Sequence, residues 1–213
     1  KMIGDIIGLG GKFFFIMLMM FCITQVINII LMRVQGAEAV TEYGIAYKYF
    51  SVVNMTFLIV IAPYWSAFAD AYVKKDFAWM QKCLKRLERI LLLLVPIFVV
   101  MVALFPFALK IWIGDEVEIS SFVVIAVAVF QFLLCAGNLY MTTLNGTSKV
   151  VLQIVIYACF AVISIPSMNF LCRTFGVAGI TIIPSLVFLT QAIFGRIQLG
   201  KLIAQTASGI WNK

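Results

Sequence analysis

Six long apolar runs constrain this sequence more than any other feature. Five of them hold about twenty residues without a charge, and the second run is longer and contains Lys48 and Asp70. At a rise of 1.5 Å per residue, a helix of about twenty residues crosses the roughly 30 Å hydrocarbon core of a bilayer. The expected spans are 13–32, 45–72, 90–109, 122–144, 150–171 and 175–194. We therefore predict an all-α integral membrane protein with six transmembrane helices.

The composition agrees with that class and excludes others. Hydrophobic residues make up 64% of the chain and charged residues 12%, which is more apolar side chain than a soluble fold of 213 residues can cover. The net charge of +7 comes without any nucleic-acid recognition motif, so we expect membrane lipids as partners and no nucleic acid. The chain has no histidine, and its spans show no paired carboxylates or nucleophile beside a base. We expect no enzymatic activity and no cofactor.

Two further residue groups could suggest a metal site or disulfides, and both are interpreted otherwise. The acidic residues Asp115, Glu116 and Glu118 share one short loop without a fourth ligand, so we expect a solvated loop and no metal. The five cysteines show no C-x-x-C spacing, and four of them fall in or at the edge of apolar runs. We predict that they are reduced core residues.

The segment 73–89 lies between the second and third runs and is amphipathic. Its apolar residues Phe77, Met80, Leu84 and Leu87 recur at helical spacing opposite Lys82, Lys85, Arg86 and Arg89. Such a pattern is typical of a helix that lies along the membrane surface, so we predict a cytoplasmic amphipathic helix here. Pro63 precedes this segment and is expected to kink or tilt the second span.

Basic residues are distributed unequally between the two sides of the predicted bundle. With six spans, one side holds twelve of the sixteen: Lys1, Lys12, Lys74, Lys75, Lys82, Lys85, Arg86, Arg89, Lys149, Arg196, Lys201 and Lys213. The other side holds Arg33, Lys48, Lys110 and Arg173. Since basic loops stay in the cytoplasm, both termini are expected there. The predicted organisation is a cytoplasmic segment at 1–12, a six-helix lobe at 13–199 and a cytoplasmic tail at 200–213.

Polar residues inside the spans are the candidate functional residues, because an amide in hydrocarbon needs a partner helix or a watery cavity. The candidates for a substrate cavity are Gln25, Asn28, Lys48, Asn54, Gln131, Asn138 and Thr142. Gln131, Asn138 and Thr142 share one helical face, and Gln25 and Asn28 are three residues apart on another. Two interpretations stay open for the uncharged ones: they line a cavity, or they hold the helices together. Lys48 either faces a cavity or snorkels to the nearby interface.

Several short motifs together resemble a known family. They are G-A-E-A-V-x-E-Y at 36–43, A-P-Y-W-S-A-F-A-D-A-Y at 62–72, D-F-A-W at 76–79, I-W-I-G-D at 111–115 and N-G at 145–146. Over roughly Gly8 to Leu199 the chain looks like the C-terminal half of bacterial polysaccharide flippases. These O-antigen and capsular repeat-unit transporters belong to the multidrug/oligosaccharidyl-lipid/polysaccharide exporter superfamily. The block at 62–72 joined to 76–79 is the most specific part of the resemblance.

The resemblance implies a function as well as a fold. Such proteins have about twelve or more spans in two lobes, and they pass undecaprenyl-diphosphate-linked glycans across the inner membrane by alternating access. This chain would be one lobe, whose partners are the lipid-linked anionic glycan and a missing N-terminal lobe; a start at Lys1 agrees with a fragment. Relatives often carry an acidic residue beside the Asn28 position, but Ile27 stands here, which leaves the coupling cation open. The alternatives are a multidrug or small-molecule exporter of the same superfamily and a non-transporting structural subunit.

Overall fold

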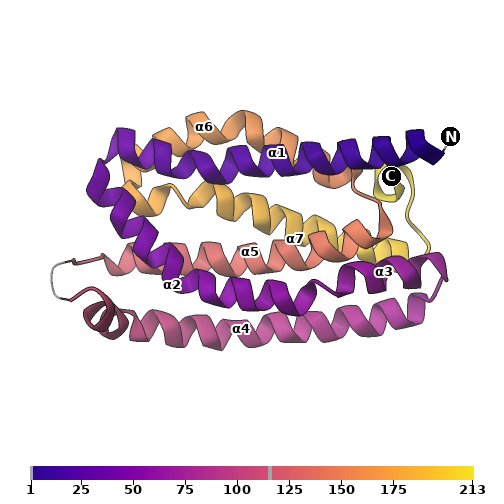
Figure 1. Cartoon of the computed structure of the whole chain (residues 1–213), viewed down its shortest axis with the longest axis horizontal. Coiled ribbons are helices and arrows are strands. Elements are labelled where there is room, and N and C mark those ends of the chain that lie inside the picture. The colour runs from indigo at the N-terminus through magenta and orange to yellow at the C-terminus, as the bar shows by residue number, and fades with distance from the viewer. Residues whose placement is uncertain (1, 115–116) are drawn as a thin grey trace.

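The structure, a computed structural model, describes residues 2–114 and 117–213, and every regular element in those ranges is helical. The elements are α1 (Met2–Val34), α2 (Ala37–Ile61), α3 (Tyr64–Val73), α4 (Phe77–Trp112), α5 (Ser121–Thr147), α6 (Val151–Gly179), α7 (Ile182–Ile203) and the 3-10 helix η1 (Gly209–Asn212). The long helices run side by side, and both termini lie at one end of the bundle (Figure 1).

Six helical stretches in the described part of the chain are long and apolar enough to cross a membrane. They are Gly10–Val34, Ala37–Val73, Phe77–Trp112, Ser121–Thr147, Val151–Gly179 and Ile182–Ile203. The predicted all-α fold with six helices of membrane-spanning length is therefore confirmed. The helices are longer than the predicted runs, because polar residues at the ends of each run continue the same helix into the connections.

Helix α5 forms the centre of the bundle. It packs against α2, α3, α4 and α7, whereas α1 packs mainly against α6. Small residues allow α7 to approach it closely: Gly137 lies against Phe188, and Gly195 lies against Tyr140. Close approach through small residues is typical of membrane helices, which gain little from the hydrophobic effect and associate through van der Waals contact. As a result, most side chains in the second half of α5 are buried.

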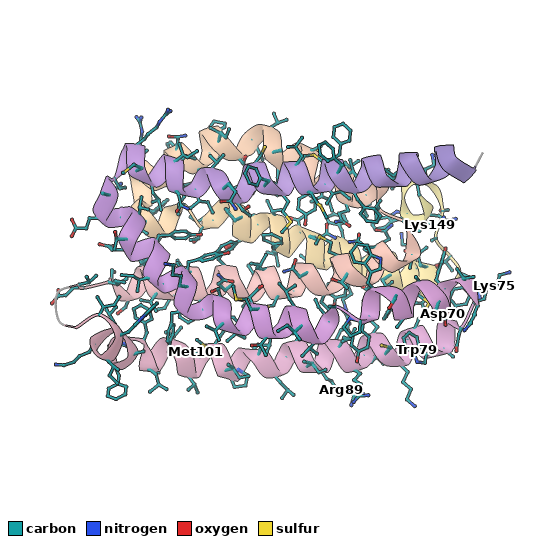
Figure 2. The ribbon with its side chains drawn as sticks, in the orientation of Figure 1. Asp70, Lys75, Trp79, Arg89, Met101 and Lys149 are labelled. Carbon is teal, nitrogen blue, oxygen red and sulfur yellow. The ribbon has the colours of Figure 1, made fainter. Side chains whose placement is uncertain are left out.

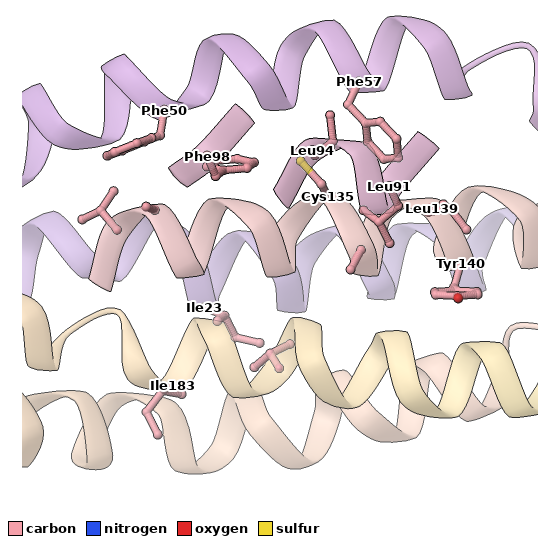
Figure 3. Close-up of a cluster of buried hydrophobic side chains, with 14 of the residues drawn as sticks. Ile23, Phe50, Phe57, Leu91, Leu94, Phe98, Cys135, Leu139, Tyr140 and Ile183 are labelled. Carbon is pink, nitrogen blue, oxygen red and sulfur yellow. The ribbon is translucent and has the colours of Figure 1, made fainter. Parts of the chain in front are cut away.

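Aromatic packing joins α2 to α4. The Phe50 ring stacks on Phe105 with ring centroids 6.1 Å apart, and on Phe98 with centroids 6.0 Å apart. Figure 3 shows Phe57 and Leu91 continuing this contact toward the other end of the bundle. Because α4 is otherwise largely outward-facing, this row of rings holds it against the remaining helices.

The five cysteines are free, as predicted, but they are not all core residues. Cys83, Cys135 and Cys172 are buried, whereas Cys22 and Cys159 are exposed on the outer faces of their helices. An apolar run indicates that a residue lies within a membrane-spanning helix. The position of the residue around that helix decides whether it faces protein or lipid.

The second span is divided into two helices at Pro63, where the sequence predicted a kink or tilt. Helix α2 ends at Ile61, and α3 begins at Tyr64. Proline has no backbone N–H to donate and its ring clashes with the preceding turn, which favours a kink or break; α2 breaks here, whereas α4 continues through Pro96 and Pro106. At the far end of α3, Lys75 adopts the left-handed conformation with φ 59°, which lets the N–H of Asp76 bond to the carbonyl of Ala71. The chain thus reverses into α4 within three residues.

The separate amphipathic helix predicted at 73–89 is not confirmed, because residues 77–112 form one continuous helix, α4. Its first turn is capped by the Asp76 side chain, which accepts from the N–H of Trp79 at 3.0 Å. The apolar side chains Met80 and Leu87 are buried in the bundle, and the Trp79 ring contacts Phe68 of α3 at 5.6 Å. The same pattern suits a helix packed on protein or on a lipid surface, and here the apolar face meets protein.

The connection between the last two spans lies later than predicted. The sequence suggested a turn at residues 172–174, but these residues are helical and α6 runs to Gly179. The break comes at Gly176, whose φ of 63° interrupts the helical geometry. Glycine adopts this conformation without steric cost, so it permits the reversal toward α7.

The C-terminal tail folds back onto the bundle. The Gln198 side chain of α7 donates to the carbonyls of Lys149 and Trp211, at 3.0 and 3.1 Å. The Lys149 amine donates to the carbonyl of Asn212 at 3.0 Å, and the Lys201 amine lies 4.1 Å from the centre of the Trp211 ring. The tail therefore closes the space between α7 and the α5–α6 turn, at the end of the bundle where Lys149 lies (Figure 2).

Candidate functional site

A cavity of about 330 Å³ lies between α1, α2 and α5. Its polar lining comes from Thr24, Gln25 and Asn28 on α1 and from Lys48 on α2. The remaining lining residues are Met20, Ile27, Tyr43, Gly44, Tyr47, Phe130 and Leu134. The cavity therefore combines one cation, two amides and an aromatic surface.

Helical periodicity explains why α1 contributes these side chains. Ile23, Ile27 and Ile30 follow one face of α1 and are buried against the bundle. Gln25 and Asn28 are offset from that face and remain exposed, three residues apart, toward the cavity. Helix α1 thus buries its apolar face and turns its two amides to the open space.

The aromatic surface is formed by two tyrosines of α2 and a phenylalanine of α5. The rings of Tyr43 and Tyr47, which are one turn apart, have centroids separated by 5.6 Å. The Tyr47 ring lies 6.3 Å from that of Phe130, which in turn contacts Phe188 of α7 at 6.3 Å. This continuous contact gives the cavity a firm wall on the side of α5 and α7.

Lys48 lies beside this wall and is exposed to the cavity. It is eleven residues from the start of α2 at Ala37, which corresponds to about 16 Å along the helix axis. No carboxylate of the described residues forms an ion pair with it. Its ammonium group is therefore available to an anion that enters the cavity.

The structure brings together three of the seven predicted site residues, Gln25, Asn28 and Lys48, and places the other four outside the cavity lining. Asn54 is buried and donates to the sulfur of Cys135 on α5 at 3.4 Å. Gln131 is fully buried and donates to the carbonyl of Tyr47 at 3.5 Å, so it supports the cavity wall from behind. The remaining two, Asn138 and Thr142, lie in the second half of α5, buried and half-buried respectively.

Buried amide oxygens without a protein partner occur along the same interior. They include Oε1 of Gln131 on α5 and Oε1 of Gln191 on α7. An unsatisfied polar atom in a low-dielectric interior costs about 1–3 kcal/mol, so such atoms call for bound water. The polar interior of α5 and α7 is therefore a place where internal water would be stabilised.

The acidic loop of the sequence analysis is only partly covered by the structure, since Asp115 and Glu116 lie outside the described residues. Glu118 lines a small cavity of about 160 Å³ together with Glu38 and Glu42 at the start of α2. Among the side chains that the structure places, no three histidine, cysteine, aspartate or glutamate residues are grouped to hold a metal ion.

Sequence reasoning missed two groups. The first is the pair Tyr43 and Tyr47, which the sequence could have indicated, because the two tyrosines are four residues apart on one helical face and Tyr47 directly precedes Lys48. The other group is a polar cluster in which the Tyr140 hydroxyl and Nε of Arg196 both donate to Oε1 of Glu88, each at 2.9 Å. These residues are separated by 52 and 108 positions, so no local pattern could have linked them.

Comparisons with known proteins add no family to these observations: no protein-family model, no curated protein and no solved structure matches the chain.

Proposed function

We propose that this chain is one lobe of a two-lobe membrane transporter that moves a lipid-linked anionic oligosaccharide across the membrane by alternating access. The observation that carries the proposal is the cavity in which Gln25, Asn28 and Lys48 meet beside an aromatic wall. The resemblance of the sequence motifs to polysaccharide flippases names the substrate class, an undecaprenyl-diphosphate-linked glycan. The helical bundle supplies the supporting framework.

Each part of the cavity suits one part of such a substrate. An unpaired lysine in a site of low dielectric attracts a diphosphate more strongly than the same lysine would in water. The amides of Gln25 and Asn28 offer both donors and acceptors, which sugar hydroxyls require. The rings of Tyr43 and Tyr47 offer apolar faces with a polar edge, which suit the boundary between a sugar and a lipid chain.

The size of the cavity supports the one-lobe proposal. About 330 Å³ is at the lower end of the range for small-ligand sites, which is about 300–1,000 Å³. An oligosaccharide with its diphosphate would fit only in part, so further walls would come from a second lobe. Transporters of this kind bind substrate between two lobes near the middle of the bilayer, and the lobes rock to open either side.

The membrane orientation is part of the proposal. Both termini, the α3–α4 turn and the α5–α6 turn lie at the same end of the bundle (Figures 1 and 2). That end carries the excess of basic residues, which favours the cytoplasmic side of a bacterial inner membrane. Substrate loaded there would be released at the end where α1 meets α2.

A second candidate is a multidrug or small-molecule exporter of the same superfamily. The observation that favours it is the aromatic wall of Tyr43, Tyr47 and Phe130, since aromatic rings also bind lipophilic cations. Lys48 weighs against it, because a lysine inside the cavity repels such cations.

The charge of Lys48 provides the test. We expect Lys48→Gln, in the chain reconstituted in bilayer nanodiscs, to bind a polyprenyl-diphosphate-linked oligosaccharide about tenfold more weakly, because a charge-assisted hydrogen bond is lost. Lys48→Arg should retain most of the affinity. Lys82→Gln is the matched control, since Lys82 is exposed on α4 and does not line the cavity. Affinity is measured by isothermal titration calorimetry.

Three results would contradict the proposal. If Lys48→Gln bound the oligosaccharide as tightly as the parent chain, Lys48 would not bind the diphosphate. A gain in affinity for a lipophilic cation on Lys48→Gln, without glycan binding by the parent, would favour the small-molecule exporter. The absence of binding to either ligand class would favour a structural subunit.

A further inference from the structure

A second cavity, of about 460 Å³, lies between α4 and α7 at the end of the bundle that carries the α3–α4 turn. Its α4 side consists of Gln81, Leu84, Lys85 and Glu88, and its α7 side of Arg196, Ile197, Gly200, Ile203 and Ala204. None of these residues lines the Lys48 cavity. The two cavities are therefore separate sites, and the second is outside the proposed transport path.

The depth of this cavity follows from the length of α4. Its uncharged stretch from Ile90 to Leu109 has about the length needed to cross the hydrocarbon core. The charged residues just beyond that stretch, Arg89, Glu88, Arg86 and Lys85, then lie in the headgroup layer. Because Lys85 and Glu88 line the cavity, its polar rim is at the level of lipid phosphates.

The charges at the rim favour an anion. Glu88 is already neutralised, since Oε1 accepts from Nε of Arg196 and from the Tyr140 hydroxyl, each at 2.9 Å. The Arg196 side chain is nevertheless 68% exposed, so its guanidinium remains accessible to a ligand in the cavity. Lys85 has no ion-pair partner among the residues that the structure places. Two cations and one carboxylate give the rim a net positive charge.

The floor of the cavity is apolar. It is formed by Leu84 on α4 and by Ile197 and Ile203 on α7. Gly200 adds no side chain, and a Cβ built there meets no atom within 4 Å, so the space over α7 is open. A cationic rim above an apolar floor matches a phosphate joined to a glycerol backbone and its acyl chains, whereas a soluble phosphate would use only the rim.

We propose that the cavity between α4 and α7 binds the phosphate headgroup of an anionic phospholipid of the surrounding leaflet. Lys85 and the terminal nitrogens of Arg196 hold the phosphate, and Leu84, Ile197 and Ile203 contact the glycerol and the first acyl carbons. Glu88 and Tyr140 act as positioning residues, because they fix the guanidinium of Arg196 at the rim. The bound lipid joins α4 to α7, between which the Arg196–Glu88 ion pair is the one polar side-chain contact in the described part of the chain.

Lipid retention by the purified chain tests this site. The chain is exchanged into detergent micelles that contain equal amounts of phosphatidylglycerol and phosphatidylcholine, and the retained lipids are counted by native mass spectrometry. We expect the parent chain to retain phosphatidylglycerol preferentially and Lys85→Gln to lose about fivefold of that preference, the effect of one basic residue near an anionic lipid. Arg89→Gln is the matched control, because Arg89 is one turn away on α4 and points away from the bundle (Figure 2).

The outcomes separate the proposal from its rivals. An equal loss in Lys85→Gln and Arg89→Gln would overturn it in favour of general surface charge. Displacement of phosphatidylglycerol by millimolar inorganic phosphate would overturn it in favour of a soluble-anion site. Glu88→Gln, which keeps the shape of the side chain, should reduce retention less than Lys85→Gln does, and the reverse order would contradict the assigned roles. Binding of glycan in the Lys48 cavity affects none of these measurements.

Discussion

The same residue type has different roles at different places in this bundle. Asn28 lies on the open side of α1 and lines the Lys48 cavity, whereas Asn54 is buried and donates to Cys135. The sequence left both interpretations open for each of them, cavity lining and contact between helices. The structure assigns one residue to each. The difference comes from the position of each side chain around its helix, since both residues lie in apolar helices long enough to cross a membrane.

These two asparagines give a matched pair of substitutions. We expect Asn28→Leu to weaken binding of the polyprenyl-diphosphate-linked oligosaccharide with little change in stability, because its amide faces open space. Asn54→Leu should leave binding nearly unchanged and lower the free energy of unfolding by roughly 0.6 kcal/mol, the average for a hydrogen bond between membrane helices. Binding is measured by calorimetry and stability by titration with sodium dodecyl sulfate. The opposite distribution of effects would contradict the assignment of the cavity.

At the scale of the element, α4 shows how one pattern can serve two structures. Its first thirteen residues are amphipathic, and alone they are typical of a helix on a membrane surface. In the structure they continue a membrane-spanning helix, with Met80 and Leu87 buried in protein. In the proposed lipid site, this extension places the polar rim of the α4–α7 cavity in the headgroup layer. The continuity of α4 is therefore a requirement for the proposed lipid site.

The continuity of α4 can be measured directly. Spin labels at Lys82 and Leu104, both exposed, are 22 residues apart and should be separated by about 33 Å along a straight helix. A segment that bent by a right angle at Arg89 to lie on the membrane would shorten that distance to about 25 Å. Labels at Leu93 and Phe107 serve as a control, because both arrangements place them about 21 Å apart. Double electron–electron resonance in nanodiscs distinguishes the two distances.

For the molecule as a whole, the main consequence of an even number of membrane-length helices is that both termini lie at the same end of the bundle. The N-terminus, the C-terminus and the two turns with most basic residues lie at one end of the bundle. The tail from Gly209 to Asn212 is fastened there by Gln198 and Lys149. Since the tail packs against α7, we expect this end to be the more rigid one. At the opposite end, Gln35 and Gly36 connect α1 to α2.

The orientation of the whole bundle is the fifth prediction. We expect a cysteine at Lys82 to be protected from an impermeant maleimide in intact cells, and a cysteine at Glu118 to react, because basic residues stay on the cytoplasmic side. Replacing Cys22 and Cys159, the two exposed native cysteines, by alanine lowers the background. Permeabilised cells are the control, in which both positions should react. If only the Lys82→Cys variant were labelled in intact cells, the orientation of the bundle would be opposite to the predicted one.

The comparison of sequence and structure shows where prediction succeeded. Six apolar runs predicted six spans because the bilayer requires about twenty apolar residues per helix. Pro63 predicted a kink or tilt of the second span, because its ring and missing N–H act locally, and the structure has a break between α2 and α3 there. The turn at 172–174 was predicted wrongly, since a basic residue and two small polar ones look like a loop, yet the helix continued until Gly176 allowed the chain to reverse.

The sequence by itself determined the all-α class of this protein, its six helices of membrane-spanning length and a set of seven candidate residues, because lipid-length apolar runs and helical spacing are local properties. It could not separate Gln25, Asn28 and Lys48, which line the cavity, from the four candidates that do not. Only the tertiary structure decided which polar side chains share a cavity, and that Glu88, Tyr140 and Arg196 meet beside a second one. Both cavities bring together helices that are distant in the sequence, α5 with α1 and α2 in the first and α4 with α7 in the second. Their composition depends on how each helix is rotated and how closely it packs against α5, and no single helix carries that information.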